Sequence, residues 1–415
     1  MTLHTDLPPI VLTGADWPEE LERSRERGPI ARVELPGGVL AWSVTDTAVL
    51  RALMKDPRIS KDAHQHWPAL RDGEITPAWA MYGWVAVRSM LTVDGEDHTR
   101  LRRVVTPAFT PRRIEAMRPG IEAITAELIE GLSAMPIGET VDLRALFVNE
   151  VPIRVICELM GVPASPAAAL CACTTKILDI TLTPAQAEAN LGEMYQVLAE
   201  LIAFKADHRG EDVTSTLLEA YARDELSDKE LADTLMLLIV AGYETTTHLL
   251  DQAIVALLRD RTLLSNAMAG EFTWGAVVEE VLRLQPPLPL MPFRFAVTDI
   301  DLGDGFVIKA GDVVLVNLAA VGRDPNLHRT PERFDPTRAE GGHLAFGHGP
   351  HFCVGAPLAR LEATVALPAL FAAFPDMELA ADPQDLAPIA SLVVNGHLRL
   401  PVTLGARTHA APRPA

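Results

Sequence analysis

The chain has 415 residues, a formal net charge of −19 at pH 7 and four cysteines. This acidity argues against nucleic acid and anionic membrane surfaces as partners, and so few cysteines cannot form a disulfide framework in a chain of this length. The N-terminus shows no basic segment followed by an apolar core, and no uninterrupted apolar run reaches the roughly 18 residues of a membrane span. We therefore expect a cytoplasmic, monomeric protein without a membrane part.

The N-terminal half combines a short β pattern with many helical ones. Residues 28–44 form two alternating, β-rich runs around a Pro-Gly-Gly turn, which predicts a hairpin. Residues 45–57 have helical spacing, and Thr45 can cap this helix. Helical spacing recurs over residues 98–110, 112–133, 145–162, 185–207, 213–225 and 227–258.

A second β pattern follows late in the chain, over residues 293–321, and residues 398–404 add a last short strand. Many helices with a small segregated sheet predict a mainly α fold of the α+β class. No linker or internal repeat interrupts residues 15–404, which predicts a single domain there. Residues 1–14 are then an N-terminal arm, and residues 405–415 a disordered tail.

The most informative segment is FGHGPHFCVG, residues 346–355, which runs into an Ala/Leu-rich stretch. Cys353 stands at the mouth of a predicted helix, where backbone N–H groups and the macrodipole favour an anion and lower the pKa of a thiol. Gly347 and Gly355 let the backbone pass close to a flat ligand. Pro357 suits the first helical turn. A lone thiolate on a metal beneath a planar group indicates a haem-thiolate centre.

This segment resembles the haem-binding loop of the cytochrome P450 monooxygenases, F-G-x-G-x-H-x-C-x-G. It matches at Phe346, Gly347, Gly349, His351, Cys353 and Gly355. The resemblance implies the cytochrome P450 fold over about residues 15–404, in a bacterial, actinomycete-type member. It also implies haem b (iron protoporphyrin IX) with Cys353 as the iron ligand. An inert buried cysteine, and a zinc site of His348, His351 and Cys353, are the alternatives.

A second motif, AGYETTTHLL, begins at Ala241 in the middle of the longest apolar helix. Glu244 is costly to bury without a partner, and Thr245 can donate to the carbonyl of Ala241 one turn earlier. With Gly242, these residues predict a groove in the helix for a small diatomic molecule and water. The motif resembles the family pattern A/G-G-x-D/E-T-T. This implies that Thr245 hydrogen-bonds dioxygen, that Glu244 relays protons and that Ala241 lies against the haem. A hinge without a proton role is the alternative, and His248 is interpreted as a packed helix residue.

Two further constellations are expected to hold the haem. Glu280 and Arg283 share a helix face, and this spacing alone most often gives a solvated pair. The resemblance implies that they form a structural clamp behind the haem with Arg333.

In the segment DGEDHTRLRR, His98 and Arg102 share a helix face, where two cations repel unless an anion lies between them. The resemblance assigns the haem propionates to His98 and Arg102, with Arg294 and His351 as further partners. A solvated basic face is the alternative interpretation of this segment.

The resemblance implies that O2 and an organic substrate meet in a pocket above the haem. By analogy with the fold, the expected pocket residues are Trp84, Val85, Met90, Val240, Tyr243, Leu288, Met291 and Val393. This apolar lining suits hydroxylation of a bulky apolar molecule such as a steroid, a macrolide or another polyketide. Oxidative aromatic or C–C coupling of a secondary metabolite, such as a cyclic dipeptide, is one alternative, and a non-catalytic haem-thiolate sensor is another.

Electrons are expected from NAD(P)H through a separate ferredoxin and reductase, because the chain has no spare length for a flavin domain. A local basic patch of Arg100, Arg103, Arg112 and Arg113 is the expected docking site for an acidic ferredoxin.

Overall fold

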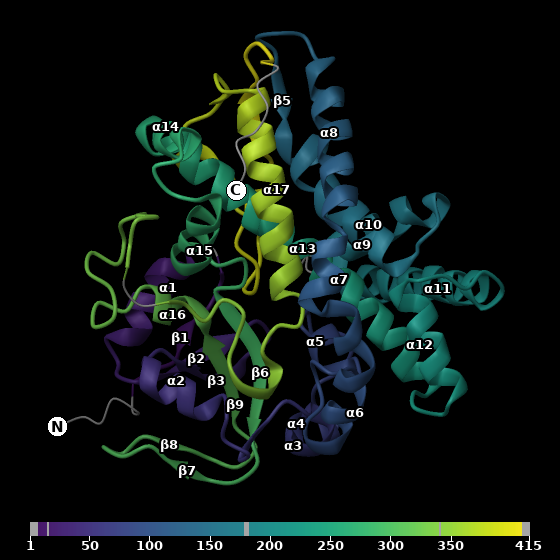
Figure 1. Cartoon of the computed structure of the whole chain (residues 1–415). Coiled ribbons are helices and arrows are strands. Elements are labelled where there is room, and N and C mark those ends of the chain that lie inside the picture. Colours follow the sequence, from purple (N-terminus) through teal and green to yellow (C-terminus); the bar gives the residue numbers. More distant parts are fainter. Residues whose placement is uncertain (1–6, 15, 178–181, 340–341, 409–415) are drawn as a thin grey trace.

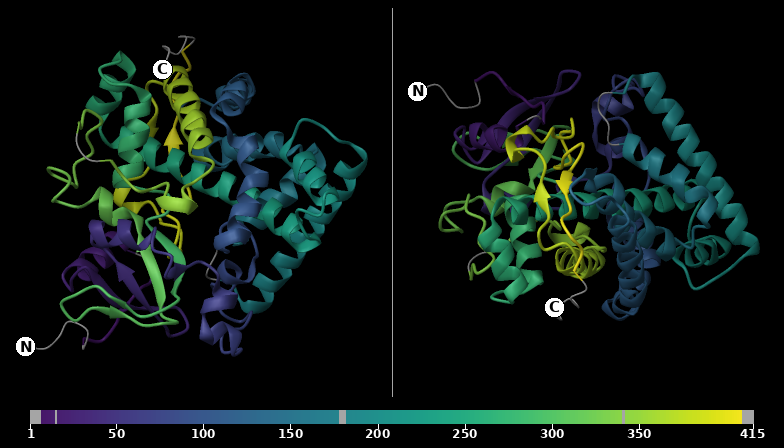
Figure 2. Two further views of the ribbon diagram at one scale, coloured as in Figure 1. Left: turned by 60° about the horizontal axis from the view of Figure 1, so that its bottom comes forward. Right: turned by 90° about the horizontal axis from the view of Figure 1, so that it is seen from above.

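The computed structural model describes residues 7–14, 16–177, 182–339 and 342–408 (Figure 1). Helices dominate, and the described strands form one larger sheet and two small ones. Figure 2 shows the larger sheet on one side of the molecule, and α11 (Pro184–Asp207) and α12 (Val213–Ala222) on the opposite side. The predicted mainly α fold of the α+β class is confirmed.

The other helices of the described residues are α1 (Trp17–Arg25), α2 (Thr47–Leu53), α3 (Ala63–His66), α4 (Pro68–Arg71), α5 (Gly83–Ala86), α6 (Gly95–Val105), α7 (Pro111–Ala116), α8 (Arg118–Ser133), α9 (Glu150–Met160), α10 (Ala164–Ile177), α13 (Asp228–Arg259), α14 (Arg261–Ala269), α15 (Trp274–Leu284), α16 (Leu318–Gly322) and α17 (Ala356–Ala373). Short helices η2 (Thr106–Phe109), η3 (Arg144–Val148), η4 (Gly349–His351) and η5 (Pro383–Asp385) lie between them.

The larger sheet joins strands from the N-terminal part of the chain to strands from the late β segment. Its order is β1 (Ile10–Val11), β2 (Ile30–Leu35), β3 (Val39–Val44), β9 (Val313–Asn317), β6 (Leu290–Ala296) and β4 (Ile59–Ser60). The antiparallel pairing of β2 with β3 confirms the predicted hairpin. β3 pairs in parallel with β9, whose residues are all buried, so the N-terminal hairpin is fixed to the late β segment. The small sheets are β10 (Glu378–Leu379), β11 (Pro401–Thr403) and β5 (Thr140–Asp142), and β7 (Ile300–Asp301) with β8 (Val307–Ile308).

The long helix α13 crosses the molecule and packs against α9, α15 and α17 (Figure 1). A capping box of Ser227 and Glu230 begins it, and most of its side chains are buried. Gly242 lies where a Cβ atom would stand 2.6 Å from Ile156 Cδ1, so this glycine lets α9 approach closely. The helix is continuous through the AGYETTT motif, so the glycine serves helix packing and does not interrupt the helix.

One helix of the described residues, α17, is long and apolar enough to cross a membrane by length and composition alone. Its mean hydropathy is 1.3, and 72% of it is buried inside the protein, as in the core helix of a soluble protein. It packs against α8, α13 and α15. Pro357 lies in its first turn as predicted, and the helix continues through Pro368.

Several sequence-based boundaries were wrong. The helix after the hairpin is capped by Asp46, whose side chain accepts from Val49 N, while Thr45 donates to the carbonyl of Gly28. The β pattern of residues 293–321 ends in α16, which begins at Leu318.

Both predicted ends of the domain are also tied to it where the structure describes them. Strand β1 lies inside the expected N-terminal arm, and it pairs with β2. In the expected tail, Thr408 N donates to the carbonyl of Ala373 over 2.8 Å, and Arg407 pairs with Glu130. Residues 409–415 lie outside the described residues.

Candidate active site

A cavity lies between α13, the loop before α17, and β6. It contains about 1650 Å³ of space free of protein atoms, part of it open to solvent. The predicted site residues that line it are Trp84, Met90, Arg102, Val240, Ala241, Glu244, Thr245, Leu288, Met291, Arg294, Phe346, Gly347, His351, Cys353 and Gly355. Segments far apart in the sequence therefore bring most of the predicted site to one place.

The Cys353 loop has the backbone that its glycines predict. Gly347 and Gly349 have φ values of 77° and 75°, a left-handed conformation that other residues rarely adopt. The Cys353 N–H donates to the carbonyl of Phe346 over 2.8 Å, which turns the thiol toward the cavity. Gly355 is the N-cap of α17.

The predicted lowering of the thiol pKa is wrong for the protein surroundings alone. Cys353 is exposed to the cavity, yet the surrounding protein atoms desolvate its thiol and raise its pKa, and the opposing hydrogen bonds from the backbone N–H groups of Gly355 and Ala356 do not outweigh this effect. A bound metal cation deprotonates a coordinating thiol outright, so a thiolate at Cys353 requires the metal itself.

α13 brings an alcohol and a carboxyl group to the cavity. Thr245 Oγ1 donates to the carbonyl of Ala241 over 2.8 Å, as predicted. Glu244 is 4% exposed, and its Oε1 has no hydrogen-bond partner. Its Oε2 lies 3.4 Å from Nε2 of the buried His248. An acid and an alcohol therefore share one turn of helix at the cavity wall.

A second buried carboxyl group lines the cavity and was missed from the sequence. Glu362 of α17 is 1% exposed, and its Oε2 has no hydrogen-bond partner. Burial raises the pKa of Glu362 well above its usual range, because the charged form loses its hydration there. The signal was a glutamate inside the Ala/Leu-rich stretch, where it is expensive to bury.

Cations gather at one end of the cavity. Arg294 is 3% exposed with Nη1 lacking a hydrogen-bond partner, and burial lowers its pKa to about 10. Arg102 lines the same cavity, and its Nη2 donates to the carbonyl of Phe352 over 2.8 Å. Lys61, which the sequence-based prediction missed, is 5% exposed and also lines it. Burial, and then the charge of Arg294, lower the pKa of Lys61 to about 7. Buried cations of this kind call for an anion.

His98 and His351, the two histidines expected to contact the propionates, have other partners in the structure. His351 Nε2 lies 2.8 Å from Asp94 Oδ1, and Asp94 also accepts from Ser60 Oγ and from the backbone N–H of Lys61. Burial lowers the pKa of His351 to about 4, so at neutral pH the ring is uncharged and its Nε2–H donates to the carboxylate. His98 is buried behind His351, with ring centroids 4.2 Å apart, and does not line the cavity.

A β-bulge explains how two residues of β6, Met291 and Arg294, both line the cavity. Met291 and Arg294 are three residues apart, which in a regular strand places side chains on opposite faces. The register of β6 against β9 shifts between these two residues, and both line the cavity.

Three predicted pocket residues do not line the cavity. Val85 and Val393 are buried in the core cluster beside the larger sheet, while their neighbours Trp84 and Val394 line the cavity instead. Tyr243 is 1% exposed in another core cluster, because it is two residues from Ala241 and so faces away from the cavity side of α13.

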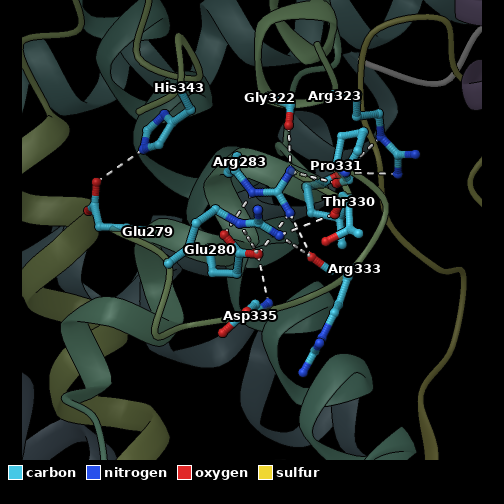
Figure 3. A network of polar contacts seen from close by, with 12 residues as sticks. Glu279, Glu280, Arg283, Gly322, Arg323, Thr330, Pro331, Arg333, Asp335 and His343 are labelled. Carbon is cyan, nitrogen blue, oxygen red and sulfur yellow. Dashed lines mark hydrogen bonds and ion pairs between the residues drawn. The ribbon is translucent and has the colours of Figure 1, made fainter. Parts of the chain in front are cut away.

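The clamp lies behind the cavity, and Figure 3 shows it from close by. Arg283 Nε and Nη2 each lie 2.7 Å from a carboxylate oxygen of Glu280, a bidentate buried pair. The guanidinium also donates to the carbonyls of Gly322, Pro331 and Arg333. One side chain thus ties α15 to α16 and to the following loop.

The predicted third member of the clamp is corrected. Arg333 contributes its backbone carbonyl, and in Figure 3 its side chain points away from Glu280. The second cation near Glu280 is Arg338, with Nε 3.5 Å from Oε1. No sequence pattern distinguishes these two arginines, because both lie in the same irregular loop after α16.

The predicted basic patch is smaller than expected. Arg100 is paired with Glu230 and Asp97, and the hydrogen bonds that it donates to these carboxylates raise its pKa. Arg103, Arg112 and Arg113 are exposed, although Arg103 lies 3.7 Å from Glu225.

These residues fit a haem. Cys353 can hold the iron, and Arg294, Arg102 and Lys61 provide the cations that two propionates require. The unpartnered Nη1 atom of Arg294 supports this fit. No group of three or more His, Cys, Asp and Glu side chains within the described part of the chain could hold a metal ion, which leaves the zinc interpretation without a ligand set. A haem-thiolate iron takes a single protein thiolate instead.

Comparisons with known proteins agree with this site. The family model "Cytochrome P450" matches residues 274–390. The 2-hydroxy-5-methyl-1-naphthoate 7-hydroxylase of Streptomyces carzinostaticus is 46% identical over 404 residues, covering 96% of this chain and 98% of the relative. The structure of CYP154A1 from Streptomyces coelicolor A3(2) superposes with a TM-score of 0.91 at 47% identity, covering 95% of this chain and 100% of that one.

A testosterone-bound CYP154C4 from Streptomyces sp. ATCC 11861 superposes with a TM-score of 0.93 at 40% identity, covering 97% of this chain and 99% of that one. Identity at this level over nearly the whole chain establishes common descent, and the site contains the family's thiol and its acid–alcohol pair. The chain belongs to the cytochrome P450 family and is a monooxygenase of the bacterial, actinomycete type.

Proposed function

We propose that this monooxygenase hydroxylates a bulky, uncharged, apolar secondary metabolite such as a steroid, a macrolide or another polyketide. The observation that carries the proposal is one cavity lined both by Cys353 and by Glu244 and Thr245, with mostly apolar walls between them. Relatives support this range of substrates: one is named a naphthoate hydroxylase, and another was solved with testosterone bound.

The charge of the cavity narrows the substrate class. Its basic lining residues are Lys61, Arg102, Arg294 and His351, at the end assigned to the propionates. The lining from α5, α13 and the loop before β6 contains Trp84, Leu237, Val240 and Leu288, and no cation. A carboxylate substrate would be desolvated there without a partner. We therefore expect a neutral substrate, unlike the naphthoate in the name of the relative.

The haem supplies dioxygen activation when bound, with the thiolate of Cys353 pushing electron density that favours O–O cleavage. Arg294, Arg102 and Lys61 hold the propionates and so fix the orientation of the haem. Thr245 presents a hydroxyl at the cavity, and Glu244 carries a proton to that position. The apolar side chains exclude water and hold the substrate by burial of its surface.

Electrons come, in this proposal, from NAD(P)H through a ferredoxin and its reductase. The exposed Arg103, Arg112 and Arg113 lie on an otherwise acidic protein and support docking of an acidic ferredoxin. Such docking weakens with added salt. We propose that the enzyme acts as a cytoplasmic monomer.

Two measurements test the function. The absorbance spectrum of the reduced protein with carbon monoxide is expected to show the strongly red-shifted Soret band of a thiolate ligand, and a band at the histidine-ligated position would contradict it. Testosterone and a macrolide aglycone are then titrated for a spin-state shift, with a hydroxynaphthoate as the charged comparison. A shift with the naphthoate alone would contradict the neutral class.

The proton role is tested separately. Thr245→Ala is expected to consume electrons but release them as peroxide, whereas Thr247→Val, a buried neighbour on the same helix that does not line the cavity, should leave coupling unchanged. Unchanged coupling in Thr245→Ala would end the proton role. Product mass separates hydroxylation, which adds one oxygen, from oxidative coupling, which adds none.

A further inference from the structure

Three titratable side chains form a buried stripe along α13. Glu244, His248 and Asp251 are spaced i, i+4 and i+7, which places them on one face of the helix. Their exposures are 4%, 0% and 0%. Glu244 lines the cavity, and the other two do not. The stripe therefore leads away from the cavity into the protein, where ionisable groups are expensive to bury.

His248 is the middle member of this stripe. Its Nε2 lies 3.4 Å from Oε2 of Glu244, close enough for an ion pair. Neither ring nitrogen makes a regular hydrogen bond in the described structure. A Cβ atom at Gly396 would overlap His248 Nδ1, so a glycine in the C-terminal loop makes room for the ring. The imidazole is thus enclosed between α13 and this loop, with one nitrogen toward Glu244.

The far end of the stripe reaches a histidine near the surface. Asp251 Oδ2 accepts from the backbone N–H of His397 over 3.0 Å and lies 2.8 Å from its Nδ1. The His397 side chain is 15% exposed, whereas that of Asp251 is fully buried. Asp251 Oδ1 has no hydrogen-bond partner in the described structure. The same loop is held on α13 by Asn395, whose Oδ1 accepts from Gln252 over 3.0 Å.

We propose that His248 supplies protons to Glu244, and that Asp251 and His397 connect His248 to solvent. The inference rests on the proposed proton role of Glu244 and extends it. His248 acts through Glu244 and is therefore a positioning residue. Two other ionisable side chains, Glu362 of α17 and Arg144 of η3, lie on elements packed against α13. Neither forms a hydrogen bond or an ion pair with His248 in the described part of the chain.

The step balances as a proton transfer. After Glu244 has given its proton to the cavity, Nδ1 of His248 takes up a proton from the Asp251 side as the Nε2–H bond breaks and an O–H bond forms at Glu244 Oε2, so the ring stays neutral. His248 and Asp251 are separated by a helical i, i+3 spacing of about 5–6 Å, so this uptake requires one bridging water molecule. His397 takes the replacement proton from solvent. No electron moves along this route.

A spectroscopic measurement tests the contact without turnover. In holoenzyme with 15N-labelled histidine, held in the diamagnetic ferrous–carbon monoxide state, the His248 Nε2 resonance is assigned by its loss in His248→Asn. We expect Glu244→Gln to shift this resonance, and Thr247→Val to leave it in place. A His248 Nε2 resonance that ignores Glu244→Gln would overturn the proposal.

A kinetic measurement tests the supply of protons. NADH oxidation by the holoenzyme with a plant-type ferredoxin and reductase is followed in H2O and D2O without added substrate. We expect His248→Asn and His248→Gln to slow oxidation by about tenfold or more and to raise the solvent isotope effect, because a general acid is lost. Thr247→Val should behave as the wild type. Wild-type rates and isotope effects in both His248 variants would overturn the proposal.

Two further variants keep the outcomes distinct. His397→Asn preserves a hydrogen-bond donor for Asp251 but cannot titrate. Because His397 is only half-buried, this variant leaves the core intact. It therefore tests the route to solvent even if both His248 variants lose haem. A raised isotope effect in His397→Asn supports the route, and an unchanged one overturns it. If Thr245→Ala stays coupled, the proton role in the proposed function fails. If Thr245→Ala uncouples while the His248 and His397 variants match the wild type, only the route fails.

Discussion

The carbonyl of Arg283 occupies the space that a Cβ atom at Gly322 would fill, while the Arg283 guanidinium donates back to the carbonyl of Gly322. The two segments therefore meet backbone to backbone, and a glycine is required for the clamp to close. This contact joins the end of α15 to the end of α16.

We expect Gly322→Ala to destabilise the folded protein by about 1–3 kcal/mol or more, because overpacking forces the two backbones apart. The measurement is the urea midpoint of the haem-loaded protein. Gly192→Ala is the matched control, since nothing lies within 4 Å of a Cβ at that exposed site within α11. It should gain about 1 kcal/mol from helix propensity. Equal midpoints for the two variants would contradict the contact.

From the corrected clamp we expect substitutions of Arg338 and Arg333 to have unequal effects. Arg338→Gln should lower haem content and cost about 1–3 kcal/mol, because it removes one of the two cations beside the buried Glu280 carboxylate, which keeps its pair with Arg283. Arg333→Gln should change little, because the exposed Arg333 contributes its backbone carbonyl. Haem content per protein and the unfolding midpoint measure both. A larger loss in Arg333→Gln would restore the family assignment.

Glu362 should make stability fall as pH rises. Burial raises its pKa, so in the pH range above the usual pKa of a glutamate the unfolded chain loses a proton that the folded protein keeps. The unfolded state is then favoured by up to about 1.4 kcal/mol per pH unit. Glu362→Gln removes this effect, so the unfolding midpoint of the variant should rise relative to that of the wild type as the pH increases above about 4.3, the usual pKa of a glutamate.

Glu115 is a control for the pH dependence of Glu362, because its pKa is shifted in the opposite direction. A hydrogen bond from Arg118 lowers the pKa of this exposed glutamate, so its contribution to stability is present above its usual pKa and lost in acid. Glu115→Gln should therefore gain nothing as pH rises. A midpoint difference for Glu362→Gln that is independent of pH would mean that the carboxyl group is ionised in the folded protein.

Lys61 should couple haem binding to the uptake of a proton. Burial holds its pKa at about 7 in the protein without propionates, and an adjacent carboxylate favours the charged form. Haem binding then takes up a proton above about pH 7, so haem affinity should fall as pH rises through this range. Lys61→Met should bind haem more weakly and lose that pH dependence. Haem titration of the apoprotein at several pH values measures both effects.

The fold class, the hairpin and the Cys353 loop were predictable because each depends on local patterns. Alternating residues fix β2 and β3, and left-handed backbone at Gly347 and Gly349 needs glycine whatever surrounds it. The hydrogen bond from Thr245 to Ala241 is likewise local, since both residues lie on one turn of α13.

Contacts between distant segments were not predictable from local patterns. Val394 lines the cavity where Val393 was expected, because a loop has no periodicity that says which neighbour faces inward. Lys61 and Asp94 reach the site only through the folding of separate segments, so neither carried a signal in the sequence. The pKa of Cys353 depends on desolvation by the surrounding protein atoms, which a helix terminus alone does not reveal.

Gly14 joins the segment before α1 to the loop beside the cavity. A Cβ atom at Gly14 would overlap the carbonyl of Ser391, three residues before Val394 at the cavity wall. The segment before α1 therefore packs against the loop that carries Val394. We expect Gly14→Ala to displace this loop and so to alter which molecules the pocket accepts, although residue 14 is remote from Cys353 in the sequence.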